Sequence, residues 1–324
     1  PPPLNPTTNL THHPELGLST TDVNCWIRRL AGRLLQAIVQ SRYSNPETLH
    51  LSQVPTPVPG DNEVLIRVHA AAASVADVHL LTGKPYLLRF MGYGLLRPKS
   101  PIIELSVAGK VEAVGPKVSE WQVGDEVFGE LTGGAFAEYV CAPSSKLARK
   151  PAKLSFEDVA AIPDSSIAAR QGLRDVGGIR SGQHVLINGA SGGVGTYAVQ
   201  IAKALGARVT AVCSQRNAPR SRFLGVDVVI DYNTQDFTKI GCPYDLMLDL
   251  VGNRNLAECG SVLQRGSVYV GSAGQVAGDW FGPLRWMASV MVTLLRSSQK
   301  MAVMMATPSQ QDLCTVAKML EAGR

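Results

Sequence analysis

Short apolar runs alternate with glycine- and proline-rich turns through the first half of the chain. The residues of Glu63–Ala70 alternate between apolar and polar side chains, a period typical of a strand with one buried face. Other short runs of strand type lie on either side of it: Ala37–Arg42, Leu49–Val54, Val107–Gly115, Asp125–Glu130 and Phe136–Cys141. The pattern predicts a small all-β domain over residues 37–153.

The second half begins with an apolar run, Val185–Asn188, that passes through a glycine-rich turn into the helix-like stretch Thr196–Leu205. Strand-like runs recur afterwards, each separated from the next by the length of a helix or crossover: Val209–Cys213, Val228–Ile230, Leu246–Val251 and Ser267–Val270. Strands that alternate with helices indicate a parallel sheet with helices on both faces. Residues 154–324 are therefore expected to form a doubly wound α/β domain, and the boundary is expected near Pro151–Leu154.

The turn between the first strand and helix of this domain has the composition of a phosphate cradle. It leaves backbone N–H groups unpaired at a helix N-terminus, where the helix dipole favours an anion, and glycine lets a pyrophosphate approach the main chain. An ordinary glycine turn in an α/β unit is the alternative. The predicted cofactor-binding residues in this turn are Ala190, Ser191, Gly192, Gly193, Val194 and Gly195.

The second strand of the domain ends without an acid. Proteins that prefer NAD usually place Asp or Glu at this position, where the carboxylate binds the ribose 2′-hydroxyl. Here Ser214 can donate to a phosphate oxygen, and Arg216 can meet a 2′-phosphate with its planar guanidinium. NADPH is therefore the expected cofactor, although Arg216 could instead be a solvated residue at a helix start. Further cofactor contacts are predicted at Asn217, Tyr232, Val251 and Gly271.

Composition limits the class of protein. The 324 residues are 45% hydrophobic and 18% charged, with a net charge of +5 and no block of basic residues, so nucleic acid is not an expected partner. The six cysteines are widely spaced, which favours reduced thiols and a reducing compartment. Trp286–Leu295 is apolar but about half as long as the ~20 residues of a membrane span, and predicts a buried or interfacial helix.

Residues 1–36 are expected to be a disordered or irregular extension outside the fold. Within it, Cys25–Gln36 carries Arg28, Arg29 and Arg33 with no acid, which could form a transit-peptide helix. The acids Glu15 and Asp22 upstream weaken that interpretation in favour of an incidental extension. The expected location is cytoplasmic, with an organellar location as the alternative.

Several motifs together resemble the medium-chain dehydrogenase/reductase superfamily. They are Val54–Gly60, Val107–Gly115, Val123–Gly129, Gly134–Val140 and Asn188–Gly195. Within the superfamily the chain resembles the zinc-independent quinone oxidoreductase branch. The resemblance implies a GroES-like β domain followed by a Rossmann NADP-binding domain. It also implies transfer of a hydride from NADPH to a quinone or an α,β-unsaturated carbonyl, and a homodimer formed through the nucleotide domains.

The positions that carry zinc ligands in alcohol-oxidising relatives hold other residues here. The stretch that corresponds to their Gly-His-Glu motif is Glu104-Leu105-Ser106, and the position of the first Cys falls around Ser74. Zinc needs three or four Cys, His or carboxylate ligands in one place, and His69 and His79 have no partner set. The sequence therefore predicts no metal site.

The chain also departs from the quinone oxidoreductase pattern. The usual Pro-Gly-x-Asp is replaced by Ile103–Ser106, the usual Asn near the nicotinamide by Ser74, and a usual Thr by a residue around Ala168, beside Asp164 and Arg170. Family members usually continue with a further segment after Leu320–Arg324, so this chain is expected to be either a fragment or a domain whose sheet ends one strand early. These departures are compatible with retained activity, with altered substrate choice, or with a domain that binds cofactor and turns over poorly.

The sequence contains no arrangement of Ser, His and Asp, or of Cys and His, that suggests a nucleophile. Hydride transfer needs mainly alignment and a donor for the developing oxygen charge, for which the candidates are Ser74, Tyr93 and, less favoured, His79. Five methionines near the end of the chain are expected either to fill the core or to line an apolar acceptor pocket: Met287, Met291, Met301, Met304 and Met305. A zinc-free reductase is the first hypothesis; an NADPH-binding sensor or scaffold and a zinc alcohol dehydrogenase are the alternatives.

Overall fold

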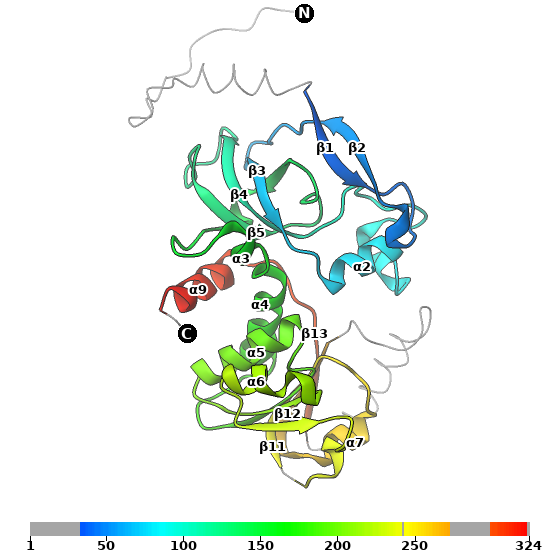
Figure 1. Ribbon diagram of the computed structural model, residues 1–324, viewed down its shortest axis with the longest axis vertical. Coiled ribbons are helices and arrows are strands. Elements are labelled where there is room, and N and C mark those ends of the chain that lie inside the picture. The colour runs from blue at the N-terminus through cyan, green and yellow to red at the C-terminus, as the bar shows by residue number, and fades with distance from the viewer. Residues whose placement is uncertain (1–32, 242, 273–298, 323–324) are drawn as a thin grey trace, which may run out of the picture.

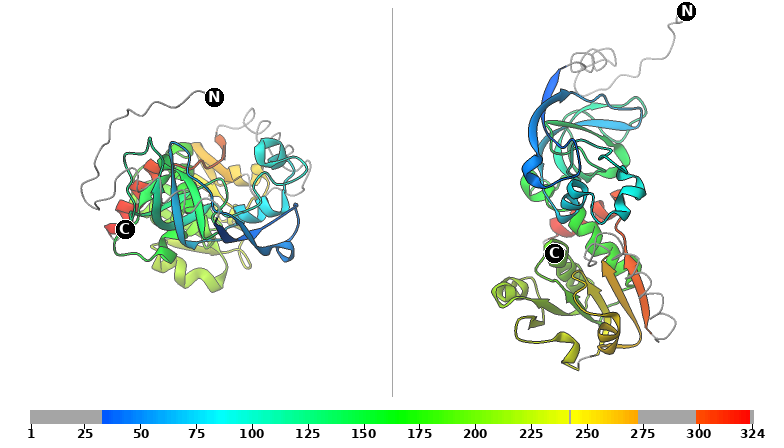
Figure 2. Two further views of the ribbon diagram at one scale, coloured as in Figure 1. Left: turned by 90° about the horizontal axis from the view of Figure 1, so that it is seen from above. Right: turned by 90° about the vertical axis from the view of Figure 1, so that its right-hand side faces the viewer.

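The computed structural model describes residues 33–241, 243–272 and 299–322. It has two lobes stacked along its long axis, an antiparallel β domain and an α/β domain (Figure 1). The perpendicular view shows the same separation, with the short helices of the linking region between the lobes (Figure 2).

The β domain is built on a five-stranded antiparallel sheet in the order β6-β3-β4-β5-β7. Alternate residues such as Val64, Ile66, Val107 and Val127 are fully buried on one face, as the period-2 pattern predicts. The strands are β3 (Glu63–Ala71), β4 (Ser106–Val114), β5 (Glu126–Glu130), β6 (Tyr139–Pro143) and β7 (Leu147–Arg149). The short helices are η1 (Pro46–Thr48), α2 (Val75–Thr82), η2 (Arg89–Tyr93) and η3 (Ser144–Lys146).

A separate hairpin-like pair, β1 (Leu34–Val39) and β2 (His50–Pro55), flanks this sheet. The prediction that residues up to 36 lie outside the fold is wrong for Leu34–Gln36, which belong to β1. The reason is that Leu35, Ala37 and Val39 alternate inward and pack against Val54 of β2. Pairing with another strand thus overrides the helix-like spacing of Cys25–Gln36, whose earlier residues lie outside the described ranges.

The α/β domain contains a six-stranded, all-parallel sheet in the order β10-β9-β8-β11-β12-β13. This order confirms the predicted doubly wound nucleotide-binding fold. Its strands are β8 (His184–Asn188), β9 (Arg208–Cys213), β10 (Val228–Asp231), β11 (Tyr244–Asp249), β12 (Leu263–Ser272) and β13 (Lys300–Met304). The strand β13 is not among the strands predicted from the sequence; its Met301 and Met304 are buried core residues, and Met305 is exposed. Met287, Met291 and Trp286–Leu295 lie outside the described residues.

Both faces of the parallel sheet are covered, which explains its continuous apolar runs. Val185 and Ile187 of β8 face one side, where the helices α4 and α5 pack, and Leu186 faces the other, with α7. The helices are α3 (Phe156–Ala160), α4 (Pro163–Arg170), η4 (Gln171–Val176), α5 (Gly193–Ala204), η5 (Gln215–Asn217), α6 (Ala218–Phe223), η6 (Phe237–Lys239), α7 (Leu256–Ser261) and α9 (Gln310–Glu321). Among the described helices, none is long and apolar enough to cross a membrane.

The two domains share a further core at their junction. Ala108 and Phe128 of the β sheet pack with Ile167 of α4 and with Leu313 and Val316 of α9. The helix α9 follows the α/β sheet in sequence but lies against the β domain, where it contacts β7 and the linking helix α4 (Figure 1). The carboxylate of Asp312 on α9 pairs with the guanidinium groups of Arg170 and Arg174, which fixes α9 to the linking helices.

Candidate cofactor and acceptor site

The glycine-rich turn lies at the carboxyl end of β8 and runs into α5. Gly189 has φ +87°, a backbone conformation that favours glycine. Gly195 faces the turn so closely that an added Cβ would lie 2.2 Å from the Gly189 carbonyl oxygen. Gly192 caps α5 without a side-chain hydrogen bond, so the first-turn N–H groups of Gly193, Val194 and Gly195 have no intrahelical acceptor. This geometry is that of a backbone anion site.

The end of β9 lies next to this turn because β8 and β9 pair in parallel, with Asn188 opposite Val212. Asn217 donates through Nδ2 to Ser191 Oγ at 3.1 Å, which joins the two predicted cofactor segments. Ser214 is half-buried and begins η5. Arg216 is exposed and forms no ion pair with any residue in the described ranges, so its guanidinium is accessible to a ligand.

The other predicted cofactor residues also lie at this edge of the sheet. Tyr232 is 53% exposed after β10, and Gly271 is buried in β12, where it pairs with Asp249. The N–H groups of Val251 and Gly252 both donate to Asp249 Oδ1, at 3.1 and 2.9 Å. The predicted residues are therefore brought to the carboxyl ends of neighbouring strands, where open α/β sheets bind their ligands.

A buried polar network missed by the sequence analysis shapes this edge. Asp249 is 1% exposed and accepts further hydrogen bonds from Asn188 Nδ2 at 2.9 Å and from the Tyr269 hydroxyl at 2.9 Å. Asn188 also donates to Asn253 Oδ1 at 3.0 Å. The sequence signal for this network is a polar residue at the end of each of two apolar strands, Asn188 in β8 and Asp249 in β11. Its bonds hold the turn after β11 against the glycine-rich turn.

On the β-domain side, Ser74 is the N-cap of α2. Its Oγ accepts from the Ala76 N–H at 3.1 Å, and its own N–H donates to Asp77 Oδ2 at 2.7 Å. The Ser74 hydroxyl also lies near Asp164, at the start of the linking helix α4, where it opposes the rise in the pKa of Asp164 that burial causes. Ser74 therefore lies where the two domains meet, although its hydroxyl is engaged in capping.

Glu104 occupies the glycine position of the family motif in a glycine-like conformation. Its φ is +81°, and it is the one non-glycine residue of the described chain with a positive φ. The neighbouring loop holds this strained backbone, because Ala135 N–H donates to the Glu104 carbonyl and Leu131 N–H to that of Leu105. The Glu104 side chain is fully buried, and its Oε1 accepts from the Ser106 N–H at 2.8 Å.

Several carboxyl groups at this junction have raised pKa values. Burial, together with repulsion from Asp77, raises the pKa of Glu104 to about 8. Burial and repulsion from Asp164 raise the pKa of Glu130 to about 7, against a smaller opposing effect of Lys146. Burial raises the pKa of Asp164 as well. The junction is thus a desolvated acidic region.

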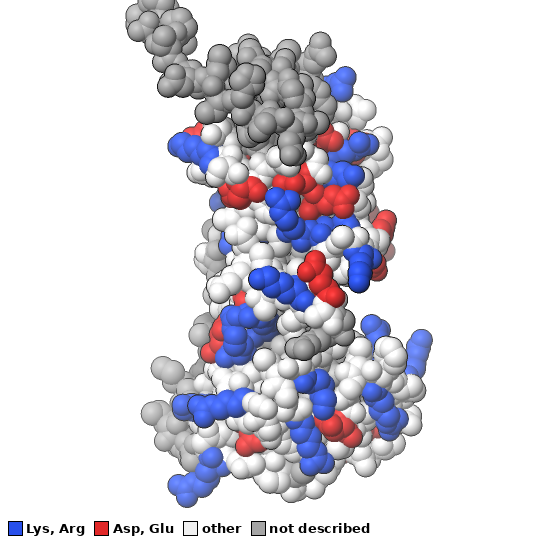
Figure 3. Space-filling model, turned by 90° about the vertical axis from the view of Figure 1, so that its left-hand side faces the viewer, with Lys and Arg blue, Asp and Glu red and all other residues white. Residues whose placement is uncertain are grey.

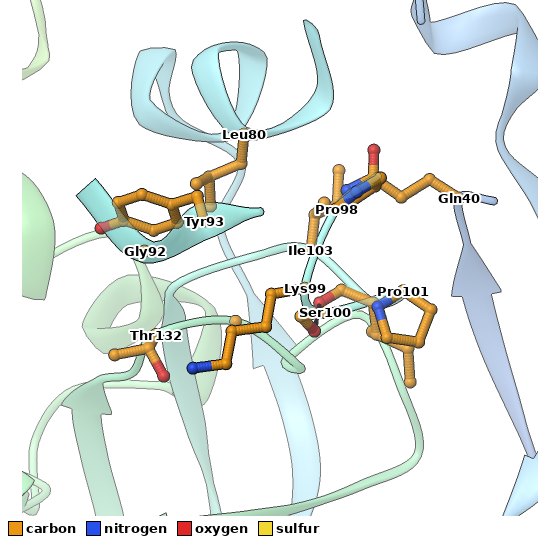
Figure 4. Close-up of a pocket in the computed structure, with 12 residues that line it drawn as sticks. Gln40, Leu80, Gly92, Tyr93, Pro98, Lys99, Ser100, Pro101, Ile103 and Thr132 are labelled. Carbon is orange, nitrogen blue, oxygen red and sulfur yellow. Dashed lines mark hydrogen bonds between the residues drawn. The ribbon is translucent and has the colours of Figure 1, made fainter. Parts of the chain in front are cut away.

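A cavity of about 600 Å³ lies between α2, η2 and the loop before β4. Tyr93 and Lys99 line it on one side, and Gln40 and Thr132 also contribute polar groups (Figure 4). Leu80, Ile102 and Ile103 supply apolar surface. The cavity brings Tyr93 into an acceptor-sized space, but Ser74 does not line it. The two predicted catalytic residues are thus separated.

The histidines noted in the sequence have structural contacts. The ring of His69 stacks on Phe156 with centroids 4.3 Å apart, and His79 Nδ1 lies 2.8 Å from the Lys84 carbonyl oxygen. Across the part of the chain that the structure describes, no group of three or more His, Cys, Asp or Glu side chains is arranged to hold a metal ion. Basic side chains are dispersed over both domains rather than gathered in one patch on the face in Figure 3.

Comparison with known proteins assigns the family. A model of the alcohol dehydrogenase GroES-like domain matches residues 60–152, and one described as zinc-binding dehydrogenase matches residues 224–324. A chloroplastic quinone oxidoreductase of Triphysaria versicolor is 31% identical over 310 residues, which are 91% of this chain and 90% of that protein. The chain belongs to the medium-chain dehydrogenase/reductase superfamily. Within it, the chain is a quinone-oxidoreductase-like member.

Two further similar proteins are also oxidoreductases. A mitochondrial NAD(P)H oxidoreductase of Bos taurus is 35% identical over 68% of this chain and 60% of its own length. The solved quinone oxidoreductase of Coxiella burnetii has a TM-score of 0.78 and 26% identity, and the match covers 90% of this chain and 89% of that one. The chain is accordingly an NAD(P)H-dependent oxidoreductase with a GroES-like and a Rossmann domain.

Proposed function

We propose that this protein reduces a quinone or an α,β-unsaturated carbonyl with NADPH and without zinc. The observation that carries the choice of NADPH is the end of β9, where Arg216 is exposed beside Ser214 and no carboxylate is present. A carboxylate at this position would repel a 2′-phosphate, whereas a free guanidinium binds one through two parallel hydrogen bonds.

The cofactor, when bound, supplies the hydride. The residues of this chain that would hold it are the backbone N–H groups of Gly193–Gly195 for the pyrophosphate and Arg216 with Ser214 for the 2′-phosphate. The bonds that Asp249 accepts from Val251 and Gly252 keep the adjoining turn in place. This arrangement supports binding through preformed backbone donors rather than through a mobile loop.

The proposal that zinc takes no part rests on the donor chemistry at the family's zinc positions. Ser74 and Leu105 stand at those positions, and Leu105 is a buried hydrocarbon side chain that cannot bind a metal. Ser106 supplies at most a weakly coordinating hydroxyl. The residues present therefore do not fit the zinc of alcohol-oxidising relatives, and no step of the proposed reaction uses a metal.

The acceptor is proposed to enter the cavity lined by Tyr93 and Lys99. Its apolar wall suits a flat, weakly polar molecule, and the relatives named quinone oxidoreductases favour that class. Tyr93 is the candidate donor to the oxygen that gains charge after hydride transfer, and Ser74 remains a candidate at the domain junction.

The test is oxidation of NADPH by the purified protein, followed at the nicotinamide absorbance with a panel of quinones and enones. Saturable oxidation with at least one acceptor, and a lower KM for NADPH than for NADH, supports the proposal. Tight NADPH binding with no turnover would instead support a sensor or scaffold, a second function favoured by the replacement of the family motif at Glu104–Ser106. Stoichiometric zinc after dialysis would contradict the zinc-free assignment.

A homodimer and a cellular location stay open to experiment. The relatives named chloroplastic and mitochondrial favour an organelle over the cytoplasm that composition alone suggests. Fluorescent-protein fusion to the full-length gene product and light scattering of the purified protein measure the two properties directly.

A further inference from the structure

Two buried carboxyl groups lie close together, Asp77 in α2 and Glu104 in the loop that leads into β4. Asp77 is 4% exposed and Glu104 is fully buried, and each is held by a backbone donor through one oxygen only. Asp77 Oδ2 accepts from Ser74 N–H at 2.7 Å, and Glu104 Oε1 accepts from Ser106 N–H at 2.8 Å. The remaining oxygens, Asp77 Oδ1 and Glu104 Oε2, are both buried and have no donor.

The carboxyl groups of Asp77 and Glu104 are close enough to act on each other, and burial together with repulsion from Asp77 raises the pKa of Glu104. Two carboxylates cannot form a hydrogen bond with each other, since both are acceptors when ionised, and one proton between them is required. That single proton would also satisfy both orphan oxygens at once. Two adjacent ionised carboxylates without a cation would instead be strongly unfavourable in a buried site.

We infer that Asp77 and Glu104 hold one proton between them, and that this shared proton keeps Ser74 in position at the junction of the two domains. Asp77 and Glu104 are positioning residues: Asp77 binds the Ser74 backbone, and Glu104 holds Asp77 from the loop that precedes β4. The backbone of Glu104, held at φ +81° by the loop that follows β5, gives the pair its geometry. The catalytic part of this inference rests on the proposed reductase function.

The surroundings of the pair contain acids and few cations. Burial and added repulsion from Asp77 raise the pKa of Asp164 on α4, and burial and added repulsion from Asp164 raise the pKa of Glu130 on β5. Lys146 in η3 is the cation that acts on Glu130. Loss of the shared proton therefore adds a second negative charge to an acidic region, which pushes α2 and its N-cap Ser74 away from the loop that precedes β4.

The pH profile of turnover tests this inference in the full chain. Burial and the proximity of Asp77 raise the pKa of Glu104 to about 8, so the wild type should lose roughly tenfold in kcat between about pH 7 and pH 9. In Glu104→Gln the amide donates to Asp77 and cannot ionise, so kcat relative to its own value at pH 7 should fall less than about twofold. Asp77→Asn should remove the same fall, because its amide can donate to Glu104.

Glu130→Gln is the matched control, since it removes another buried carboxyl with a raised pKa that does not bind Asp77. Glu130→Gln should show the same fall in kcat between about pH 7 and pH 9 as the wild type. A fall that persists in both Glu104→Gln and Asp77→Asn would overturn the inference, as would its loss in Glu130→Gln alone.

A second measurement does not depend on turnover. A protonated carboxylic acid has an infrared carbonyl band that a carboxylate lacks, so the difference spectrum of wild type minus Glu104→Gln at pH 7 should contain one such band. The band should disappear from the wild type as the pH rises to about 9. If the band is present but no acceptor is turned over, the reductase proposal is wrong and the shared proton is still supported. Absence of the band would overturn the inference of a shared proton.

Discussion

Asn217 Nδ2 donates a hydrogen bond of 3.1 Å to Ser191 Oγ, which joins the segment after β9 to the glycine-rich turn after the neighbouring strand β8. Asn217 follows β9 and Ser191 follows β8, so the contact fixes the spacing between the proposed 2′-phosphate site and the pyrophosphate site. A single bond thereby couples the two halves of the proposed cofactor site.

Removal of this bond should weaken both nicotinamide cofactors equally. Asn217→Ala should reduce the affinity for NADPH and for NADH by about 2- to 10-fold each, since a hydrogen bond contributes about 0.5–1.5 kcal/mol. Calorimetric titration of both cofactors into the wild type and the variant measures the effect. A loss confined to NADPH would mean that Asn217 contacts the 2′-phosphate rather than the turn.

Arg216 should show the opposite selectivity. Arg216→Ala should weaken NADPH by roughly 10- to 150-fold and leave NADH nearly unchanged, because a charge-assisted contact contributes about 1.5–3 kcal/mol. The control is Arg265→Ala, which removes an exposed arginine from the amino-terminal part of β12, away from the proposed site. Equal loss of both cofactors, or a wild type that prefers NADH, would rule out recognition of the 2′-phosphate by Arg216.

Two glycines of the same turn should differ in their tolerance of alanine. Gly195→Ala should lower the free energy of unfolding by about 2–3 kcal/mol, because its Cβ would lie 2.2 Å from the Gly189 carbonyl oxygen. Gly192→Ala should cost less than about 1 kcal/mol, since its Cβ would lie 3.4 Å from the same oxygen. Urea denaturation without cofactor separates this packing effect from any steric effect on binding, and equal costs would contradict it.

The ion pairs of Asp312 on α9 should contribute more to the free energy of unfolding than the exposed pair between Arg174 and Asp175. Asp312→Ala should lower the free energy of unfolding by about 3–5 kcal/mol, since it leaves the largely buried guanidinium of Arg170 without its partner. Asp175→Ala removes a half-exposed partner of Arg174 and should cost less than about 1 kcal/mol. Thermal and urea unfolding of both variants provide the comparison, and similar losses would show that burial does not set the energy here.

Glu130 should make the protein less stable as the pH rises. Burial raises the pKa of its carboxyl from 4.5 to about 7 in the folded chain, so between these values the folded state holds a proton that the unfolded state has lost. The free energy of unfolding should therefore fall over this pH window. Glu130→Gln should gain stability relative to the wild type from about pH 4 to pH 8.

Glu126→Gln is the control for that measurement. A hydrogen bond from Lys150 lowers the pKa of the Glu126 carboxyl, so this partly exposed group stabilises the fold above its ordinary pKa and loses that effect as the pH falls. The variant should become less stable than the wild type as the pH rises, by a smaller amount. The same sign for both variants would exclude burial as the cause at Glu130.

The sequence predicts the architecture better than the site. Runs such as Val185–Asn188 and the glycines of the following turn are local signals, because burial on both sheet faces and close backbone contacts restrict those residue types directly. The parallel sheet follows from the same pattern, whereas the order of its strands comes from the structure. Whether the predicted cofactor residues bind NADPH is still a prediction.

The parts that could not be predicted depend on contacts between distant segments. Asp249 reads as the end of an apolar strand, and only its approach to Asn188 and Tyr269 makes it the centre of a network. Glu104 reads as the loss of a glycine, although it adopts the conformation of that glycine and meets Asp77. The spacing of Leu34–Gln36 suggests a helix, but these residues form a strand because they pair with β2.

The position of α9 limits how the two domains can move. The polypeptide passes from the β domain to the α/β domain through the linking helices α3 and α4 and returns through residues 305–309, where Lys146 Nζ donates to the Pro308 carbonyl oxygen at 2.7 Å. A body attached at one point can swivel in any direction, but a body attached at two points can turn only about the line that joins them. Rotation of one domain against the other is therefore confined to the line that joins the two crossings, and it would have to slide Phe128 against Ile167 and Leu313 in the shared core.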